Sequence, residues 1–405
     1  MTKGLQTKRL SDLYQIGSSK RVLKSQWKTE GVPFYRGREV TRLAADGFVD
    51  NELFISEKHF GELSKEYGVP KAGDIVITAI GTIGNSHIVR SSDRFYFKDA
   101  SVLWLKRTTD VSSEFVNWWL KSSVFFDQLD RGNGATVDTL SIQKLQSVEI
   151  TVPPLAEQQR IVGLLDEAFA GLATAKANAE KNLQNARALF ESHLQSVFTQ
   201  GGPGWKPTKL GDEIDLLAGF AFKSKQYTTK EDDVRLLRGD NIIQACLRWD
   251  DVKRWPANDT KEYERYWLRE GDVVLAMDRP WVKAGLKHAT IATDDLPCLL
   301  VQRTARLRGE ANLDNRFLML LIGSSAFTSH ILGVQTGIGV PHISGQQIKD
   351  FEFVRPPLAE QRRIADKLES LREETQRLAS LYERKLAALE ALKKSLLHQA
   401  FAGEL

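Results

Sequence analysis

One nine-residue segment occurs twice in this chain and constrains its fold more than any other feature. Residues 153–161 read PPLAEQQRI, and residues 356–364, displaced by 203 positions, read PPLAEQRRI. Each copy opens a long stretch with helical spacing and follows a longer block of mixed character. A block and a helix that recur in the same order indicate an internal duplication, so any function has to use both halves.

The repeat divides the chain into four expected parts. The blocks cover residues 1–152 and 203–355, and the helices cover 153–202 and 356–405. A chain of 405 residues is too long for a single hydrophobic core. We therefore expect an α+β protein in which two globular mixed α/β blocks are joined by two long helices.

Composition narrows the class of protein. The hydrophobic fraction of 42% and the charged fraction of 27% are typical of a folded globular chain. No run approaches the roughly 18 apolar residues of a membrane span, and the first residues lack the apolar core of a signal peptide. Cys246 and Cys298 are expected as buried thiols, in preference to a disulfide or a metal site. These features favour a cytoplasmic protein with no membrane contact.

Short segments of the first block recur in the second. The offset changes from 200 to 202 to 198 and then settles at 203, which indicates variable loops on a fixed frame. We expect a strand after Gly73, a helix over 115–129 and a loop at 132–136. The matched pairs are Leu10–Asp12 with Leu210–Asp212, Tyr35–Glu39 with Leu237–Asn241, Gly73–Thr78 with Gly271–Ala276, the loop at Gly132 with Gln335–Val340, and Thr139–Ser141 with His342–Ser344.

The two helices carry different apolar stripes. The first helix should begin near Pro154, because proline and an acidic residue such as Glu157 suit a first turn. It spans about 66 Å at ~1.5 Å per residue. Its stripe is alanine-rich: Ile161, Leu165, Ala168, Leu172, Ala175, Ala179, Leu183, Ala186, Phe190, Leu194 and Val197. The other is leucine-rich: Ile364, Leu368, Leu371, Thr375, Leu378, Tyr382, Leu386, Leu389, Leu392 and Leu396.

Small residues on one helix that face large ones on the other permit close packing, so we predict that the two helices pair within one chain. The alternative is that each helix packs on its own block.

Catalytic signatures are missing from the sequence. It contains no Walker, HExxH, GxSxG or CxxC pattern. Gly81–Gly84 follows a strand but has only two glycines, and Arg279–Val282 stands at the matched position, which favours a turn over a nucleotide loop. Asp272, Asp278 and Lys283 resemble a nuclease cluster, yet Asp278 matches Ile80 in the first block. The sequence therefore predicts a binding protein without catalytic or metal-ligating residues.

Loop residues of both blocks are the candidates for contact with nucleic acid. Arginine and asparagine suit bidentate contacts to guanine and adenine edges, while lysine, serine and threonine suit phosphates. The net charge of +4 permits such binding without demanding it. The candidates are Arg36, Arg38, Thr82, Asn85, Asn133 and Thr136 in the first block, and Arg238, Asn241, Arg279, Trp281, Lys283, Lys287, Thr336, His342 and Ser344 in the second.

The whole chain resembles the specificity subunit of a type I restriction–modification enzyme. The resemblance lies in the doubled PPLAEQ helix starts, Phe34–Arg38, Gly73–Val76 and the closing Ser395–Leu405. It implies that two target recognition domains each read one half of a split double-stranded DNA sequence. It also implies that the helices form an antiparallel coiled coil between them.

The same resemblance assigns catalysis to partner subunits. Two methyltransferase subunits would use S-adenosylmethionine, and motor-nuclease subunits would need ATP and Mg²⁺. This chain itself would bind no cofactor.

A fixed pair of helices between two similar blocks, related by a pseudo-twofold axis, would set the distance between two half-sites. Since the blocks differ at most positions, the target should be asymmetric.

Two other classes of protein remain open. A coiled-coil scaffold would lack the salt-sensitive DNA binding that phosphate contacts produce. A nuclease using Asp272 and Asp278 would show metal-dependent cleavage that is lost in Asp278→Ala.

Overall fold

The computed structural model describes residues 5–129, 139–283, 285–337 and 341–404. The chain divides into two compact units. Unit 1 contains the residues up to 180 and those from 383 onward, and unit 2 contains residues 181–382. Each unit thus holds one block and one part of each long helix.

The block of unit 1 is built on a four-stranded antiparallel sheet in the order β2-β8-β5-β6. A three-stranded sheet, β4-β3-β7, and a two-stranded sheet, β1-β9, complete it. Its elements are β1 (Gln6–Arg9), α1 (Leu10–Leu13), β2 (Tyr14–Gly17), η1 (Lys24–Gln26), β3 (Val32–Tyr35), α2 (Gly37–Asp46), β4 (Phe54–Ile55), α3 (Glu57–Tyr67), β5 (Ile75–Thr78), β6 (Ser86–Ile88), β7 (Tyr96–Phe97), β8 (Val102–Arg107), α4 (Ser113–Trp119), α5 (Ser123–Leu129), α6 (Ile142–Ser147) and β9 (Glu149–Val152).

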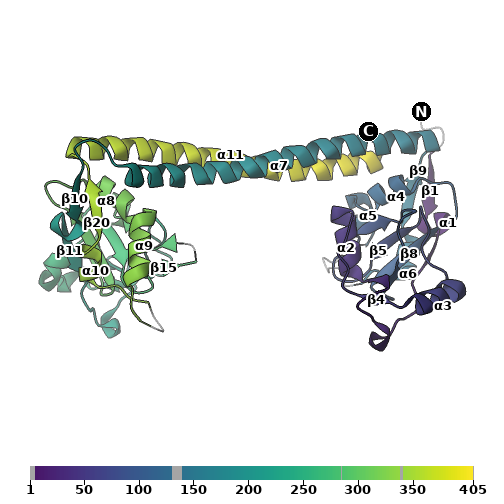
Figure 1. The fold of residues 1–405 in the computed structure, drawn as a ribbon, viewed down its shortest axis with the longest axis horizontal. Coiled ribbons are helices and arrows are strands. Elements are labelled where there is room, and N and C mark those ends of the chain that lie inside the picture. The colour runs from purple at the N-terminus through teal and green to yellow at the C-terminus, as the bar shows by residue number, and fades with distance from the viewer. Residues whose placement is uncertain (1–4, 130–138, 284, 338–340, 405) are drawn as a thin grey trace. The chain divides into compact units, whose positions relative to one another are not determined.

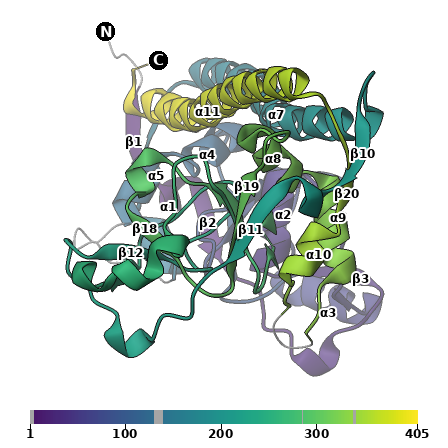
Figure 2. The same cartoon turned by 90° about the vertical axis from the view of Figure 1, so that its left-hand side faces the viewer.

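Unit 2 repeats this plan, with sheets β11-β19-β14-β17, β13-β12-β18 and β10-β20. Figure 2 shows β10, β11, β19 and β20 of this unit. Its elements are β10 (Lys206–Lys209), η2 (Leu210–Asp212), β11 (Ile214–Ala218), η3 (Ser224–Gln226), β12 (Val234–Leu237), β13 (Arg254–Trp255), η4 (Ala257–Asp259), η5 (Lys261–Tyr266), β14 (Val273–Ala276), β15 (Trp281–Val282), β16 (Gly285–Leu286), β17 (His288–Thr290), η6 (Thr293–Asp295), β18 (Cys298–Leu300), β19 (Thr304–Gly309), α8 (Asn315–Ile322), α9 (Ser325–Val334), α10 (Gly345–Lys349) and β20 (Glu352–Arg355).

The duplication is confirmed down to single hydrogen bonds. The amide of Leu10 donates to the carbonyl of Val148 at 2.9 Å, and the amide of Leu210 donates to that of Phe351 at 2.8 Å. The strand expected after Gly73 is β5, a fully buried β-branched run of the kind that suits the centre of a sheet. β14 is its counterpart and is equally buried.

The prediction of a single helix over 115–129 is wrong in one respect, because the structure has two helices there, α4 and α5. The hydroxyl of Ser122 donates to the carbonyl of Trp119 at 2.7 Å and accepts from the amide of Phe125 at 3.4 Å. A serine that bonds to the backbone on both sides ends one helix and starts the next. The two halves also differ in their connections. Unit 1 has the α-helices α2 and α3 between β3 and β5, whereas the described elements between β12 and β14 of unit 2 are β13, η4 and η5. In unit 2 a short hairpin, β15–β16, stands between β14 and β17.

The long helices are α7 (Leu155–Gln200) and α11 (Leu358–Ala402). Every predicted position of the α7 stripe is buried or half-buried. On α11 the prediction is wrong at Leu378 and Leu392, which are 40% and 47% exposed. Ala379, one position after Leu378, is half-buried instead. The cause is the drift of an α-helix of 3.6 residues per turn away from a strict 3.5-residue repeat.

An antiparallel helix pair forms within each unit. In unit 1, Lys176 of α7 pairs with Glu390 of α11 at 2.9 Å, and Lys393 lies over the ring of Phe169. Figure 1 shows α7 and α11 running side by side. Advancing along α7 thus means moving backwards along α11. Unit 2 has the same direction, since Arg372 lies over Phe190 while Leu194 joins Leu368 in the core. Pairing within one chain is confirmed.

Each helix also packs on its own block, in addition to pairing with the other helix. Ile161 and Leu165 of α7 belong to the core of unit 1, and Ile364 and Leu368 of α11 belong to that of unit 2. The start of each long helix therefore belongs both to the helix pair and to the core of its own block.

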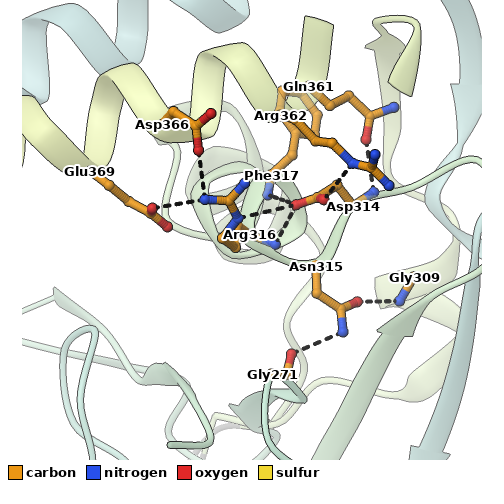
Figure 3. A network of polar contacts seen from close by, with 10 residues as sticks. All are labelled: Gly271, Gly309, Asp314, Asn315, Arg316, Phe317, Gln361, Arg362, Asp366 and Glu369. Carbon is orange, nitrogen blue, oxygen red and sulfur yellow. Dashed lines mark hydrogen bonds and ion pairs between the residues drawn. The ribbon is translucent and has the colours of Figure 1, made fainter. Parts of the chain in front are cut away.

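The glutamine of the repeated segment explains why the segment is repeated. The buried side chain of Gln158 accepts from the amide of Ser112 at 2.9 Å and donates to the carbonyl of Pro153 at 2.8 Å. Gln361 accepts from the amide of Asp314 at 2.9 Å (Figure 3). It also donates to the carbonyls of Asn312 and Pro356. In both units this amide fastens the helix start to the loop before α4 or α8.

Around this shared contact the two units differ. In unit 2, Arg316 of α8 pairs with Asp366 at 2.7 Å and with Glu369 at 3.1 Å, both on α11 (Figure 3). In unit 1, Trp118 of α4 stacks on Phe169 of α7 with ring centroids 4.7 Å apart. One junction is ionic and the other is aromatic.

Candidate nucleic-acid interface

The predicted contact residues gather at one end of each central sheet. In unit 1 the strand β5 ends at Thr78, and the next residue, Ala79, accepts a backbone bond from Leu140 and donates one to Ser101. This end therefore joins three chain segments: the β5–β6 loop, the turn before β8 and the lead into α6.

Unit 2 reproduces this end of the sheet. Met277 follows β14, donates to the carbonyl of Arg303 at 2.8 Å and accepts from the amide of Ile343 at 2.9 Å. Isolated bridges pair Ile80 with Thr139 in unit 1 and Asp278 with His342 in unit 2. The two ends therefore share one backbone frame and can be compared residue by residue.

In unit 1 the start of α2 carries Arg36 and Arg38, and both are held by Glu39. Arg36 pairs with Glu39 at 2.8 Å, and Arg38 pairs with Glu39 at 2.9 Å and with Glu52 at 2.7 Å. Burial of Glu39 by itself would raise the pKa of its carboxyl. Hydrogen bonds from Arg36 and Arg38 outweigh burial and lower the pKa of Glu39 to about 2.

Thr41, on the next turn of α2, ties the β5–β6 loop to the helix. Its hydroxyl lies 2.8 Å from that of Thr82 and accepts from the side-chain amide of Asn85 at 3.2 Å. A Cβ atom added to Gly37 would lie 3.8 Å from the carbonyl oxygen of Ile80, so the helix start directly borders this loop. The structure thus brings Arg36, Thr82 and Asn85 together. Asn133 and Thr136 lie outside the described residues.

In unit 2 the matching surface is hollowed into a pocket of about 350 Å³. Three predicted residues, Arg238, Arg279 and Lys287, line it, and so does Arg303, which the sequence analysis missed. The remaining lining is Tyr227, Gly239, Asp240, Asp278, Val301 and Gln302. Four cationic side chains and two carboxylates line the pocket, and Arg238 also pairs at 3.1 Å with Asp251, which is outside the lining.

The positive charges of this pocket are only partly compensated. Asp278 pairs with Arg303 at 2.8 Å and with His342 at 2.6 Å, so one carboxylate serves two partners. Burial lowers the pKa of Lys287, the nearby Asp240 raises it, and the nearby Arg279 lowers it further. An anion in the pocket would relieve the crowding of like charges, which suits contact with phosphate or with the acceptor atoms of a base.

Asn241, in contrast, is only 2% exposed. Its side chain accepts from the amide of Arg238 at 3.1 Å and donates to the carbonyl of Arg248 at 3.0 Å. These bonds occupy the amide within the loop, so the side chain organises the loop instead of facing a ligand. It takes the place of Glu39, which accepts from the amide of Arg36 in the same way.

The other candidates of unit 2 lie around the pocket. Thr336 and His342 exchange backbone hydrogen bonds at 2.8 and 2.7 Å, which brings their segments together. Ser344 caps α10 by accepting from the amide of Gln347. Trp281, 40% exposed, lies on β15, and Lys283 lies in the turn of the same hairpin.

Comparison with known proteins identifies the family. A sequence profile described as "Type I restriction modification DNA specificity domain" matches residues 2–183 and again residues 203–383. The chain belongs to this family. The two matches correspond to the two halves of the duplication, and specificity subunits are non-catalytic components of restriction–modification complexes.

Several relatives are specificity subunits. The type I restriction enzyme EcoAI specificity subunit of Escherichia coli is 40% identical over 169 residues, which is 42% of this chain and 28% of that subunit. The match therefore spans less than a third of that relative. The type I restriction enzyme MjaVIII specificity subunit of Methanocaldococcus jannaschii is 25% identical over 304 residues, which is 72% of this chain and 69% of that one.

Solved structures share the fold. The HsdS subunit from Thermoanaerobacter tengcongensis superposes with a TM-score of 0.67 at 18% identity, over 100% of this chain and 98% of that one. A chain from a structure concerning complex assembly and conformational transition of the type I R-M system gives a TM-score of 0.75 at 18% identity, over 100% of this chain and 99% of that one.

The carboxylates that suggested a nuclease have other roles in this specificity subunit. Asp272 is 1% exposed, and its two oxygens accept from the guanidinium of Arg308 at 2.7 and 2.8 Å. Asp278 belongs to the pocket described above. Within the described ranges no group of three or more His, Cys, Asp or Glu side chains is placed to hold a metal ion.

The remaining expectations concern cysteines and membranes. Cys246 and Cys298 are both free thiols, but the prediction that both are buried holds only for Cys298, since Cys246 is exposed. Among the described residues no single helix is long and apolar enough to cross a membrane. The bent pair of α8 and α9 meets that test jointly, by length and composition only, and residues of both helices belong to the core of unit 2.

Two residues at the sheet ends, Ile80 and Arg303, were not predicted as contacts. Ile80 is 45% exposed and Arg303 is exposed, although both flank a buried strand. The matched register of Gly73–Thr78 and Gly271–Ala276 already placed Ile80 opposite Asp278. No motif surrounds Arg303, so only the backbone bond to Met277 reveals its place.

Proposed function

We propose that this chain is the DNA-reading subunit of a type I restriction–modification complex, and that it recognises an asymmetric, bipartite sequence in double-stranded DNA. Each block reads one half. The observation that carries the proposal is the matched sheet end, which occurs once per unit on the same backbone frame with different side chains.

The chemistry of the two sheet ends favours two different half-sites. Unit 2 presents the pocket with Arg238, Arg279, Lys287 and Arg303, whose donors suit guanine edges and phosphates. Unit 1 presents Ile80, and its Arg36 and Arg38 are ion-paired with Glu39, as Arg303 is with Asp278 in unit 2. A thymine methyl group is a natural contact for an exposed aliphatic side chain.

Methylation and cleavage would come from partners. Two methyltransferase subunits that bind S-adenosylmethionine would dock along α7 and α11, and motor-nuclease subunits that use ATP and Mg²⁺ would join them. The resemblance to the family supports this docking. Exposed leucines lie scattered along both helices, which is normal for a protein surface and does not by itself mark a docking site. They are Leu155, Leu164, Leu189, Leu378, Leu381 and Leu392.

The paired helices would fix the spacing of the half-sites. Insertion of one heptad adds about 10 Å to a helix at ~1.5 Å per residue. Such an insertion should change the gap in the target and leave each half-site intact. An unchanged gap would show that the helices do not act as a ruler.

The deciding experiment is modified-base sequencing of the host genome with the gene intact and deleted. We expect methylation at one split, asymmetric motif to disappear in the deletion strain. If every motif persists, the chain does not determine methylation in that host. A pull-down of the chain then distinguishes an idle complex, which retains a methyltransferase partner, from a wrong assignment, which does not.

A further inference from the structure

Three matched positions at the sheet ends carry opposite chemistry in the two units. The first position is the second residue after β5 or β14. The second position is the residue whose carbonyl accepts a hydrogen bond from the amide of the first residue after that strand. The third position is the bridge partner of the first, and it lies before α6 or α10. In unit 1 they are Ile80, Ser101 and Thr139, and in unit 2 they are Asp278, Arg303 and His342.

In unit 2 the three side chains form one network. One oxygen of Asp278 accepts from Nη1 of Arg303 at 2.8 Å, and the other lies 2.6 Å from Nδ1 of His342. The carboxylate is mostly buried at 21% exposure, whereas Arg303 is 68% exposed and His342 is 44% exposed. The aspartate therefore forms the base of the network, and the two basic groups face outward.

The backbone at these arginines is unusual. Arg303 has φ of 66° and Arg279 has φ of 46°, both in the left-handed region that disfavours residues with a Cβ atom. Glycine would adopt either conformation with less strain. Strained residues of this kind gather at binding sites, where the side chain itself is required.

Folding stability does not account for the network. An ion pair as exposed as that between Arg303 and Asp278 contributes little to stability because water screens it. What the pairing does achieve is orientation, since it fixes one edge of a flexible guanidinium. Arg279, Lys287 and Arg238 line the same pocket and add positive charge around it.

We propose that Arg303, oriented by Asp278 and His342, reads a guanine in the half-site of unit 2. The guanidinium bonds to Asp278 through Nη1, which leaves the donors of the opposite edge for the O6 and N7 atoms of guanine. This proposal rests on the proposed function. Arg303 is the reading residue, and Asp278 is a positioning residue.

The test is methylation-motif sequencing with the complete complex, in a strain that carries the wild-type chain or a variant. Arg303→Ala should relax one guanine position of one half-site, with discrimination there reduced about 5- to 150-fold, as for the loss of a bidentate base contact. The other half-site should stay unchanged. Arg303→Lys keeps the positive charge but loses the planar, paired donors of the guanidinium, so it should relax the same position.

Two further variants separate reading from general effects. Asp278→Asn should relax the same guanine position more weakly, because the arginine keeps its donors but loses its anchor. Arg265→Ala removes an exposed arginine of the same unit that does not line the pocket, and it should leave the motif unchanged.

Three results would overturn the assignment of Arg303. They are an unchanged motif in Arg303→Ala, relaxation only in the other half-site, and a uniform loss of methylation at correct sites. The last would mark a phosphate contact. If Arg303→Ala does not accumulate as folded protein, Arg303→Lys decides alone. Absence of any motif with the wild-type chain would count against the proposed function instead, so the two failures are distinguishable.

Discussion

In unit 1 the face of α4 that meets α7 carries Trp118, stacked on Phe169, whereas the corresponding face of α8 in unit 2 carries Arg316, paired with Asp366 and Glu369. Both junctions nevertheless share one buried glutamine. The comparison shows that in both units the glutamine side chain, which bonds to backbone groups, fixes the start of the long helix to its block. The surrounding contacts are free to be aromatic in one unit and ionic in the other.

The same rule holds inside the blocks. The position of Asp74 in unit 1 is that of Asp272 in unit 2, and both aspartates follow a glycine and precede the central strand. Asp74 accepts from the indole of Trp104 at 2.9 Å, while Asp272 accepts from Arg308. A single framework position thus has a neutral partner in one unit and a charged partner in the other.

The largest expected difference comes from removing the charge at this position. Asp272→Asn leaves Arg308 without its counter-ion and should lower the free energy of unfolding of unit 2 by about 4 kcal/mol. Asp74→Asn should cost unit 1 only about 2 kcal/mol, because its donors are neutral. Hydrogen exchange of peptides from β14 and β5 in the full chain measures the two effects. Equal losses would contradict the assigned difference.

Replacing a shared glutamine should destabilise its unit more when that glutamine makes more hydrogen bonds. Gln361→Ala leaves two carbonyls and one amide without partners and should destabilise unit 2 by about 3 kcal/mol. Gln158→Ala breaks two bonds and should destabilise unit 1 by about 2 kcal/mol. Exchange in α8 and α4 reports each loss, and Gln159→Ala, at an exposed neighbour, is the control. A larger loss in unit 1 would reverse the ranking.

Acid should affect unit 1 through Glu39. The folded-state pKa of about 2 lies below the ordinary value of 4.5, so the stabilisation is complete above pH 4.5 and disappears as the pH falls towards 2. The full loss should be about 3 kcal/mol, of which about 2 kcal/mol falls between pH 4.5 and pH 2.5. Asn241, which takes the same place in unit 2, has no acidic group.

Hydrogen exchange of α2 between pH 4.5 and pH 2.5 follows this loss, and Glu39→Gln should flatten the pH profile. The segment that follows Asn241 is the internal reference. An equally steep profile in Glu39→Gln would assign the acid sensitivity to another group.

The smallest expected effect is a difference in how salt concentration changes the stability contributed by each junction. Arg316→Met removes an exposed ion-pair network and should destabilise unit 2 by about 1 kcal/mol in low salt, with the difference lost near 1 M salt because charges are screened. Phe169→Ala should cost unit 1 about 2 kcal/mol at either salt concentration, because apolar contact is not screened. Denaturant-dependent exchange at α8 and α4 measures both. A salt-independent Arg316→Met effect would mean that packing, not charge, dominates there.

Sequence reasoning was most reliable where the pattern is periodic or repeated. The α7 stripe, the strand β5 and the matched starts of the two blocks follow from local spacing, because periodicity reports which face is buried. It was least reliable for roles that depend on neighbours. Asn241 has the composition of a base-reading residue, yet its burial and its bond to Arg248 make it a loop anchor.

The sequence by itself determined the duplication, the family resemblance and the long helices, since these depend on the order and spacing of residues along the chain. Only the tertiary structure decided which side chains meet at the sheet ends. Arg303 and His342 reach Asp278 from segments 25 and 64 positions away. Contacts over such separations are created by strand register and loop closure, and no local pattern encodes them.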